Sequence, residues 1–370
     1  MHSCLLIPEL SCLIFESLHP LLTQDPKCHL QDLAALARTC RSLSASALDV
    51  LWHTQDSLGP LVLCMGDSIV EATEDKIARN AARAPVTGSD QVQHTDTMTN
   101  KFGDTYYRIR LKRQPIPADW ERVLPYAQRI KIVSSASGTN LWRPRGRWVL
   151  DDSVTTALAA AFPTIPLLPR LSSLEYSAVA PASNDAFASL ASVLLNGNMT
   201  HLRMHVSKDL EQSDVGSVLN ALPEKCPWMK DLRIALDIKN PVILSKVPSW
   251  LAPLRFIEHL DLQMRFAEGA PESPSPDDFL PRLRTLRLTG KRTYSIPFIQ
   301  SIQSQQLEEI RLILVGQLTG RALSALCTTV TSKPGWLASL RFISLSGGDP
   351  VGETSHGGVC LSAKDLCAFV

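Results

Sequence analysis

The chain has 370 residues, and its 37 Lys and Arg against 36 Asp and Glu give a formal net charge of +1. This balance argues against a strongly basic nucleic-acid binder and against an acidic solvating tail. Hydrophobic residues make up 45% of the chain, enough for a sizeable core in one large domain or two smaller ones. Aromatic residues are only 6%, so we expect a core of mainly aliphatic side chains.

The nine cysteines are scattered, odd in number and contain no Cys-x-x-Cys pair. This favours ordinary reduced thiols over a disulfide framework or a zinc module. No stretch reaches the roughly 18 uninterrupted apolar residues of a membrane span, and the apolar N-terminus lacks the basic region of a signal peptide. We therefore expect a protein of the cytoplasm, the nucleus or both, with no membrane or nucleic-acid partner.

Residues 5 to 52 predict three short helices. The first opens at Pro8, where the missing N–H costs nothing, and Ser44 is the expected N-cap of the third. Apolar residues at helical spacing mark one side of each helix: Leu10, Ile14 and Leu18, then Leu33, Leu36, Ala37 and Cys40, then Leu48, Leu51 and Trp52.

Residues 57 to 119 are expected to form a linker, with a surface helix from Glu71 to Arg83 and a flexible polar insertion over 84–105. Within it, Gly66-Asp67-Ser68 follows an apolar run and resembles the nucleophile block of GDS-type esterases. That family also has a late Asp-x-x-His block to activate the serine, and this chain has none. We therefore expect no enzymatic activity and no cofactor.

Residues 120 to 370 contain a repeat. Eight segments share an apolar-x-x-apolar-x-apolar frame, with middle anchors Ile130, Leu174, Leu202, Leu232, Leu260, Leu286, Ile310 and Ile343. After Leu174 the intervals are 28, 30, 28, 26, 24 and 33 residues, close to the roughly 20 to 29 of a leucine-rich repeat. Stretches of helical character lie between the frames, at 151–162, 184–196, 213–225, 296–305 and 320–331. The pattern predicts an α/β fold, a βα solenoid with a parallel sheet on its concave face.

Two further features belong to this region. The proline-rich stretch 271–276 is expected to lengthen one loop. An apolar helix that starts at Ser362 stops without a polar cap, so we expect either a truncated C-terminus or a short natural form that exposes its last repeat. His201 and His205 fall on one predicted strand, where four residues separate them by about 13 Å. That distance is too long for one metal ion, so no metal site is expected.

The N-terminal residues resemble an F-box. The resemblance rests on Ile7-Pro8-Glu9-Leu10 and on the stretch 33–43, with its Leu-x-x-Leu-Ala-x-x-Cys-Arg pattern. Together with the repeats and with Asp119-Trp120-Glu121-Arg122, the chain is similar to fungal F-box/leucine-rich-repeat proteins. The loop from Pro20 to His29 is longer than the usual connection of that family.

The resemblance implies two partners. A module over residues 1–56 would dock on the Skp adaptor of a cullin–RING ubiquitin ligase, and the solenoid would hold an unknown protein substrate. The implied adaptor contacts are Ile7, Pro8, Leu10, Ile14, Leu18, Leu33, Leu36 and Cys40. The alternative is an interaction scaffold whose N-terminal helices only cap the open end of the solenoid.

The open face of the predicted sheet is the candidate substrate surface, because residues between the apolar anchors point away from the core. They form the column Lys131, Glu175, Arg203, Arg233, Asp261, Arg287, Arg311 and Ser344. One hypothesis is that its arginines, flanked by His205, His259 and Thr289, bind an acidic or phosphorylated segment. The other is a solvated face whose arginines pair with Asp231, Asp261 and Glu309.

Overall fold

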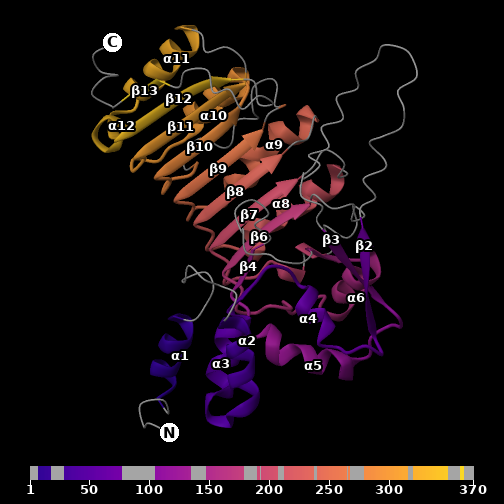
Figure 1. Ribbon diagram of the computed structural model, residues 1–370. Coiled ribbons are helices and arrows are strands. Elements are labelled where there is room, and N and C mark those ends of the chain that lie inside the picture. The colour runs from indigo at the N-terminus through magenta and orange to yellow at the C-terminus, as the bar shows by residue number, and fades with distance from the viewer. Residues whose placement is uncertain are drawn as a thin grey trace, which may run out of the picture. The chain divides into compact units, whose positions relative to one another are not determined.

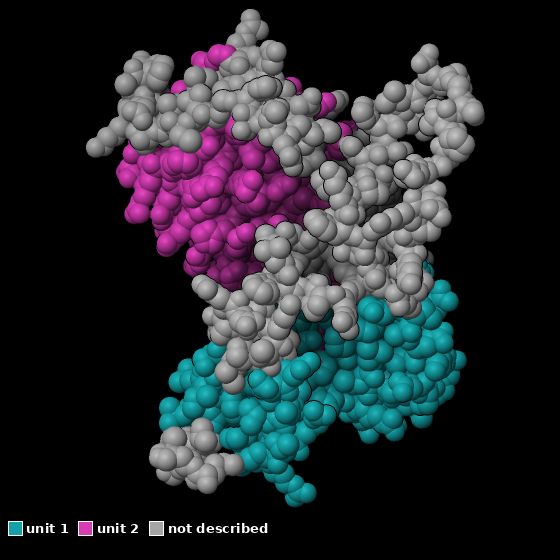
Figure 2. Space-filling view, viewed as in Figure 1, with its two compact units in different colours: residues 1–127, 136–157 teal, residues 128–135, 158–370 magenta. Residues whose placement is uncertain are grey.

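The computed structural model describes residues 7–17, 29–76, 105–134, 147–178, 190–191, 193–206, 212–236, 240–264, 266, 279–315, 320–348 and 359–361. The chain divides into two compact units, residues 1–127 with 136–157 and residues 128–135 with 158–370 (Figure 2). Leu18, the loop after Pro20, most of the 84–105 insertion, the proline-rich stretch and the chain end from Ser362 lie outside the described residues.

The first unit begins with the three helices that the sequence predicts, α1 (Pro8–Ser17), α2 (His29–Thr39) and α3 (Arg41–His53). They pack around a small core of Phe15, Leu33, Leu43, Ala47 and Val50. The predicted start of α3 was wrong by one turn. The helix begins at Arg41 with Cys40 at the N-cap, so the Ser44 hydroxyl is not needed as a cap.

The expected linker over 57–119 contains regular structure. Strand β1 (Thr54–Gln55) and helix α4 (Gly59–Leu63) precede strands β2 (Val70–Lys76) and β3 (Thr105–Leu111) and helix α5 (Pro117–Ala127). Strand β3 pairs antiparallel with β2 and parallel with β5 (Arg147–Leu150). The surface helix expected from Glu71 was wrong for residues 71–76, because their backbone groups pair with β3.

Two side-chain contacts place α5 in this unit. The rings of Trp52 on α3 and Tyr126 on α5 lie 4.8 Å apart between centroids. At the start of α5, Arg113 donates two hydrogen bonds to the Asp119 carboxylate, at 2.8 and 3.1 Å, and the Ile116 N–H donates a third. These bonds hold the pKa of Asp119 below its usual value.

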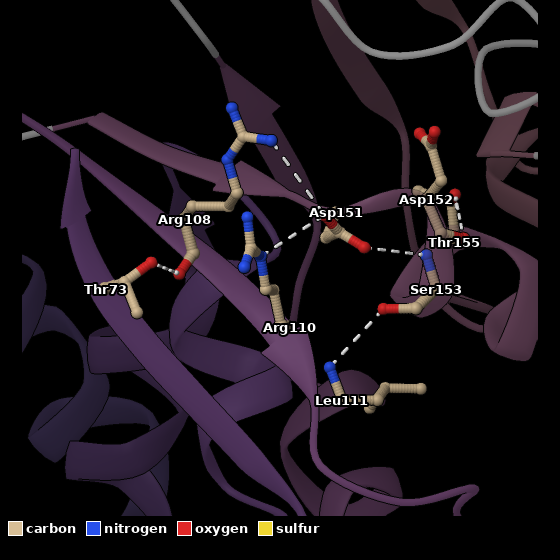
Figure 3. Close-up of polar contacts among 8 residues, drawn as sticks. All are labelled: Thr73, Arg108, Arg110, Leu111, Asp151, Asp152, Ser153 and Thr155. Carbon is tan, nitrogen blue, oxygen red and sulfur yellow. Dashed lines mark hydrogen bonds and ion pairs between the residues drawn. The ribbon is translucent and has the colours of Figure 1, made fainter. Parts of the chain in front are cut away.

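A second carboxylate joins the sheet of the first unit to helix α6 (Asp152–Ala161), as Figure 3 shows. Asp151 accepts a hydrogen bond from the Ser153 N–H at 3.1 Å, which caps the first turn of α6. Its other oxygen lies 3.9 Å from Arg108 and 3.6 Å from Arg110 (Figure 3). Arg108 and Arg110 are two residues apart on β3, so both side chains lie on the face of the strand toward Asp151.

The second unit is a sheet whose strands alternate with helices, as the sequence predicts (Figure 1). Adjacent strands from β4 to β12 run parallel, and β13 joins the last of them antiparallel. The strands are β4 (Ile132–Ser134), β6 (Ser173–Ala178), β7 (His201–Val206), β8 (Asp231–Leu236), β9 (His259–Met264), β10 (Thr285–Gly290), β11 (Glu309–Val315), β12 (Phe342–Gly348) and β13 (Val359–Leu361).

Helices of the second unit cover one face of this sheet (Figure 1). They are α8 (Gln212–Lys225), α9 (Pro241–Leu251), α10 (Arg292–Ser301), α11 (Gly320–Thr331) and α12 (Pro334–Ser339). The sequence analysis missed α9 and α12 because their prolines resemble helix breaks. Pro241 and Pro334 instead occupy the first turn, where a missing N–H costs nothing. Helix α10 starts four residues before the expected Ile296.

The predicted anchors fall into register. Leu174 pairs with Leu202, and the next anchors pair in turn as far as Ile343. The first frame was wrong by three residues, because Val133 and not Ile130 pairs with Leu174. Ile130 instead belongs with a second buried set, which we call the first anchors: Ile130, Leu171, Met199, Met229, Ile257, Leu283, Leu307 and Leu340.

A repeated backbone contact sets this register. The carbonyl of the residue just before one strand accepts hydrogen bonds from two successive N–H groups at the start of the next strand. Lys131 receives the first such pair, from Ser172 and Ser173, and Glu308 receives the last, from Arg341 and Phe342. All of these N···O distances lie between 2.8 and 3.2 Å. The starts of the strands therefore form one regular edge.

Buried polar side chains connect neighbouring repeats. Asn196, only 6% exposed, donates to the carbonyls of Leu168 in the preceding repeat and Leu194 in its own, at 3.1 and 3.3 Å. Its side-chain oxygen accepts from the Asn198 N–H at 2.8 Å. Ser304 likewise donates to Leu283 at 2.6 Å. These side chains satisfy backbone groups that no strand or helix pairs.

We predict that Asn196→Ala lowers the free energy of unfolding by about 2 kcal/mol, because it leaves the buried Leu168 carbonyl without its side-chain donor and removes the acceptor of the Asn198 N–H. Chemical denaturation followed by circular dichroism measures this change. Asn198→Ala is the matched control, since Asn198 is exposed and donates to the Pro169 carbonyl at the surface. An equal loss in both variants would contradict the structural role assigned to Asn196.

Candidate functional site

Helix α1 presents an apolar surface to solvent. Ile7, Leu10 and Ile14 repeat at intervals of three and four residues and are 46%, 40% and 44% exposed. Leu13, which the sequence analysis did not select, lies beside them and is 62% exposed. We call these four residues the α1 stripe. The side chain of Pro8 lies outside the described part of the chain.

The opposite side of α1 faces the small core. Ser11 and Phe15 are buried there, and Phe15 packs with Leu33. The prediction of an adaptor contact at Leu33 is therefore corrected, because its side chain is fully buried between the helices. Leu36 and Cys40 are partly buried against the same cluster. Of the predicted contacts whose side chains are described, Ile7, Leu10 and Ile14 therefore lie on the surface, whereas Leu33, Leu36 and Cys40 belong to the small core or its edge.

Cys40 lies at the N-terminus of α3, with its Sγ 3.1 Å from the Ser42 hydroxyl. Hydrogen bonds from Ser42 and from the Leu43 N–H lower the pKa of the thiol. Both bonds are local to the first turn of α3. Cys40 therefore stabilises the start of a helix as well as the edge of the core.

The predicted column on the open face of the sheet is present as a continuous row. Cross-strand pairing aligns Glu175 with Arg203 and continues to Ser344 on β12. In β4 the row contains Ser134, which pairs with Glu175 and donates to its carboxylate at 2.7 Å. The expected residue, Lys131, is three positions out of register. We call this row, from Ser134 to Ser344, the open-face row.

Each arginine of the open-face row has a carboxylate partner. Arg203 lies 3.0 Å from Glu175, and Arg287 lies 3.9 Å from Asp261. Arg233 makes two hydrogen bonds to Asp231, at 2.9 and 3.1 Å, and Arg311 pairs with Glu309. Four arginines therefore face four carboxylates. This pairing is the one expected for a solvated face, and it leaves the row without an excess of positive charge.

Asp261 differs from the other carboxylates of this surface. Its side chain is 18% exposed, and its Oδ1 atom is buried without a hydrogen-bond partner among the described residues. Burial raises the pKa of the carboxyl, although Arg287 and a hydrogen bond from Gln263 oppose the shift. Keeping Asp261 ionised in this poorly hydrated position therefore lowers the free energy of unfolding.

Of the three flanking residues, His259 is exposed as expected, but the other two are less accessible than the sequence suggested. His205 on β7 is half-buried, and Thr289 on β10 is only 7% exposed. Thr289 therefore offers little surface to a ligand. His201 and His205 lie on strand β7 as predicted. The described residues contain no group of three or more His, Cys, Asp or Glu side chains placed to hold a metal ion.

The Gly-Asp-Ser sequence forms a turn between α4 and β2. Gly66 has φ of +97°, a conformation that favours glycine, and the Lys112 ammonium donates to the Asp67 carbonyl at 2.7 Å. Ser68 is exposed in this turn. Local turn geometry therefore accounts for these three residues.

Comparison with protein-family models and with curated proteins finds no match for this chain. None of the helices in the described ranges is long and apolar enough to cross a bilayer. Function has to be argued from the α1 stripe and from the surfaces of the sheet.

We predict that Asp261→Asn raises the thermal unfolding temperature near pH 7. Because the pKa of Asp261 is raised in the folded state, the free energy of unfolding falls as pH rises from the ordinary Asp value, about 3.9, through the folded-state pKa. Below pH 3.9 the carboxyl is protonated in both states, so the advantage of the variant should disappear.

Asp119→Asn is the control, because it should change the unfolding temperature in the opposite direction. The pKa of Asp119 is lowered, so its stabilising contribution is present at neutral pH and is lost as pH falls through the folded-state pKa. This variant should unfold at a lower temperature near pH 7, with a smaller deficit in acid. An Asp261→Asn variant that is less stable than wild type at neutral pH would contradict the assignment.

Proposed function

We propose that this chain is the substrate-recognition subunit of a Skp/cullin/F-box-type ubiquitin ligase. The observation that carries the proposal is the α1 stripe. Ile7, Leu10, Leu13 and Ile14 are exposed on a helix whose other side is packed into a three-helix core. A contiguous apolar surface on a folded module is typical of a partner-binding site.

The order of the two units along the chain supports the same function. Helices α1 to α3 form a module of the size and order that an F-box has, and the repeats that follow resemble leucine-rich repeats in their spacing. The α1 stripe would dock on the Skp adaptor, and the repeat sheet would hold a protein substrate. Such a subunit would act in the cytoplasm or the nucleus.

This chain would act by bringing a protein substrate close to the ligase. A substrate lysine held near the ubiquitin thioester of the ligase reacts at a raised effective concentration, and this chain performs no bond chemistry itself. Leu33, Leu36 and Cys40 would contribute by fixing the position of α1 through the small core. The adaptor contact would then depend on the exposed residues of α1.

We predict that Leu10→Asp combined with Ile14→Asp abolishes co-elution with a purified Skp-type adaptor in size-exclusion chromatography. Loss of an apolar contact at the centre of an interface costs about 2 kcal/mol or more, which weakens binding at least about thirtyfold. Titration calorimetry gives the affinity. Both residues are exposed, so circular dichroism should show an intact fold.

Ile165→Asp is the matched control, because Ile165 is 69% exposed and lies in the second unit. It should bind the adaptor like the wild type. A folded, monomeric full-length chain that fails to bind the adaptor would overturn the proposal. The interaction-scaffold alternative, with the N-terminal helices as a cap, would then account for the chain.

A further inference from the structure

The edge of the sheet where the strands begin carries a surface that the open-face row does not include. The first anchors from Met229 to Leu340 are at most 4% exposed, so the residues before and after each anchor point outward. In Figure 1 these positions lie at the tails of the arrows β8 to β12. We call them the edge strip: Trp228, Lys230, Phe256, Glu258, Arg282, Arg284, Gln306, Glu308, Ser339 and Arg341.

Three adjacent repeats contribute an aromatic and cationic stack to the edge strip. Trp228 is 55% exposed, and its ring lies 4.6 Å from that of Phe256. The guanidinium carbon of Arg282 lies 4.7 Å from the centre of the Phe256 ring. Trp, Phe and Arg are enriched in the energetic centres of protein interfaces. An exposed tryptophan already held by its neighbours loses little side-chain entropy when it binds a partner.

Other residues of the edge strip line a groove. Arg284, Glu308 and Arg341 line a groove of about 360 Å³ together with Gln305, Gln306 and Ser339. The Glu308 carboxylate lies 3.8 Å from Arg284 and 3.9 Å from Arg341, and Arg341 is 81% exposed. These distances, like the 3.9 Å between Arg287 and Asp261 on the open-face row, are longer than a direct hydrogen bond. Arg284 and Arg341 therefore keep most of their hydrogen-bonding capacity for another anion.

The edge strip carries more cations than carboxylates. Its ten residues hold Lys230, Arg282, Arg284 and Arg341 against Glu258 and Glu308, and four minus two gives a formal charge of +2. The whole chain has a net charge of only +1. Charge therefore favours an anionic ligand at this edge.

We propose that the edge strip binds an acidic polypeptide segment that carries an apolar side chain. The guanidinium groups of Arg284 and Arg341 match carboxylates, and the Trp228–Phe256 stack offers the apolar contact. Glu258 and Glu308 interrupt the cations, which suits spaced carboxylates better than the continuous phosphates of a nucleic acid. The edge strip is separate from the α1 stripe, so this interaction stands whether or not α1 binds an adaptor.

The test measures fluorescence anisotropy of a labelled peptide of about twelve residues, rich in glutamate and with one central phenylalanine, on the full chain. A peptide with glutamine in place of glutamate is the comparison. We expect the acidic peptide to bind more tightly, and affinity to fall about tenfold for Trp228→Ala and for the pair Arg284→Glu with Arg341→Glu. Added salt should weaken binding of the acidic peptide.

Two variants serve as controls. Arg203→Glu changes the open-face row and Leu10→Asp changes the α1 stripe, and neither should alter peptide affinity. The proposal is overturned if the glutamine peptide binds equally well, if Arg203→Glu weakens binding as much as the edge variants do, or if a single-stranded oligonucleotide binds more tightly. Unfolding temperatures equal to wild type show that a loss of affinity in these surface variants is local.

Discussion

The backbone hydrogen bonds at the strand starts determine how the second unit is built. One carbonyl accepts two successive N–H groups from the next repeat, so neighbouring repeats cannot slide without losing both bonds. The first anchors therefore stack on one another, as do the anchors from Val133 to Ile343, in one continuous core. A single strand with its helix could not bury these residues alone, and each repeat is stabilised by its neighbours.

Because the register is fixed, charged residues on neighbouring strands lie directly opposite one another. Arg203 lies opposite Arg233, and Arg287 lies opposite Arg311, an arrangement that would be repulsive without partners. Glu175, Asp231, Asp261 and Glu309 supply those partners. Because the arginines are about half exposed, each pair contributes little to stability. With Asp231 and Glu309 counted beside the row, four carboxylates match the four arginines of the open face.

The repeat frame allowed the parallel sheet, its register from Leu174 onward and the open-face row to be predicted, because buried aliphatic residues recur at a nearly constant interval. The first strand was misplaced because Ala127, Ile130 and Ile132 match the apolar frame in sequence, although Val133 is the residue that pairs with Leu174. Periodicity placed the helices of the N-terminal module, but it did not separate the exposed Ile7 from the buried Leu33. Which side of a short amphipathic helix meets its neighbours depends on tertiary packing. The Asn196–Leu168 and Trp228–Phe256 contacts each join residues 28 apart, so local patterns gave no signal for them.

After Leu174 the intervals between repeats vary from 24 to 33 residues, yet the hydrogen-bonding pattern at the strand starts is the same in every repeat. Insertions change the length of the return path through the helices, and adjacent strands remain about 4.8 Å apart. A ligand in the polyproline II conformation has three residues per turn and rises about 3.1 Å per residue, so every third side chain would face this edge at about the separation of two strands. An acidic segment bound as proposed would then be selected by the spacing of its residues as well as by their charge.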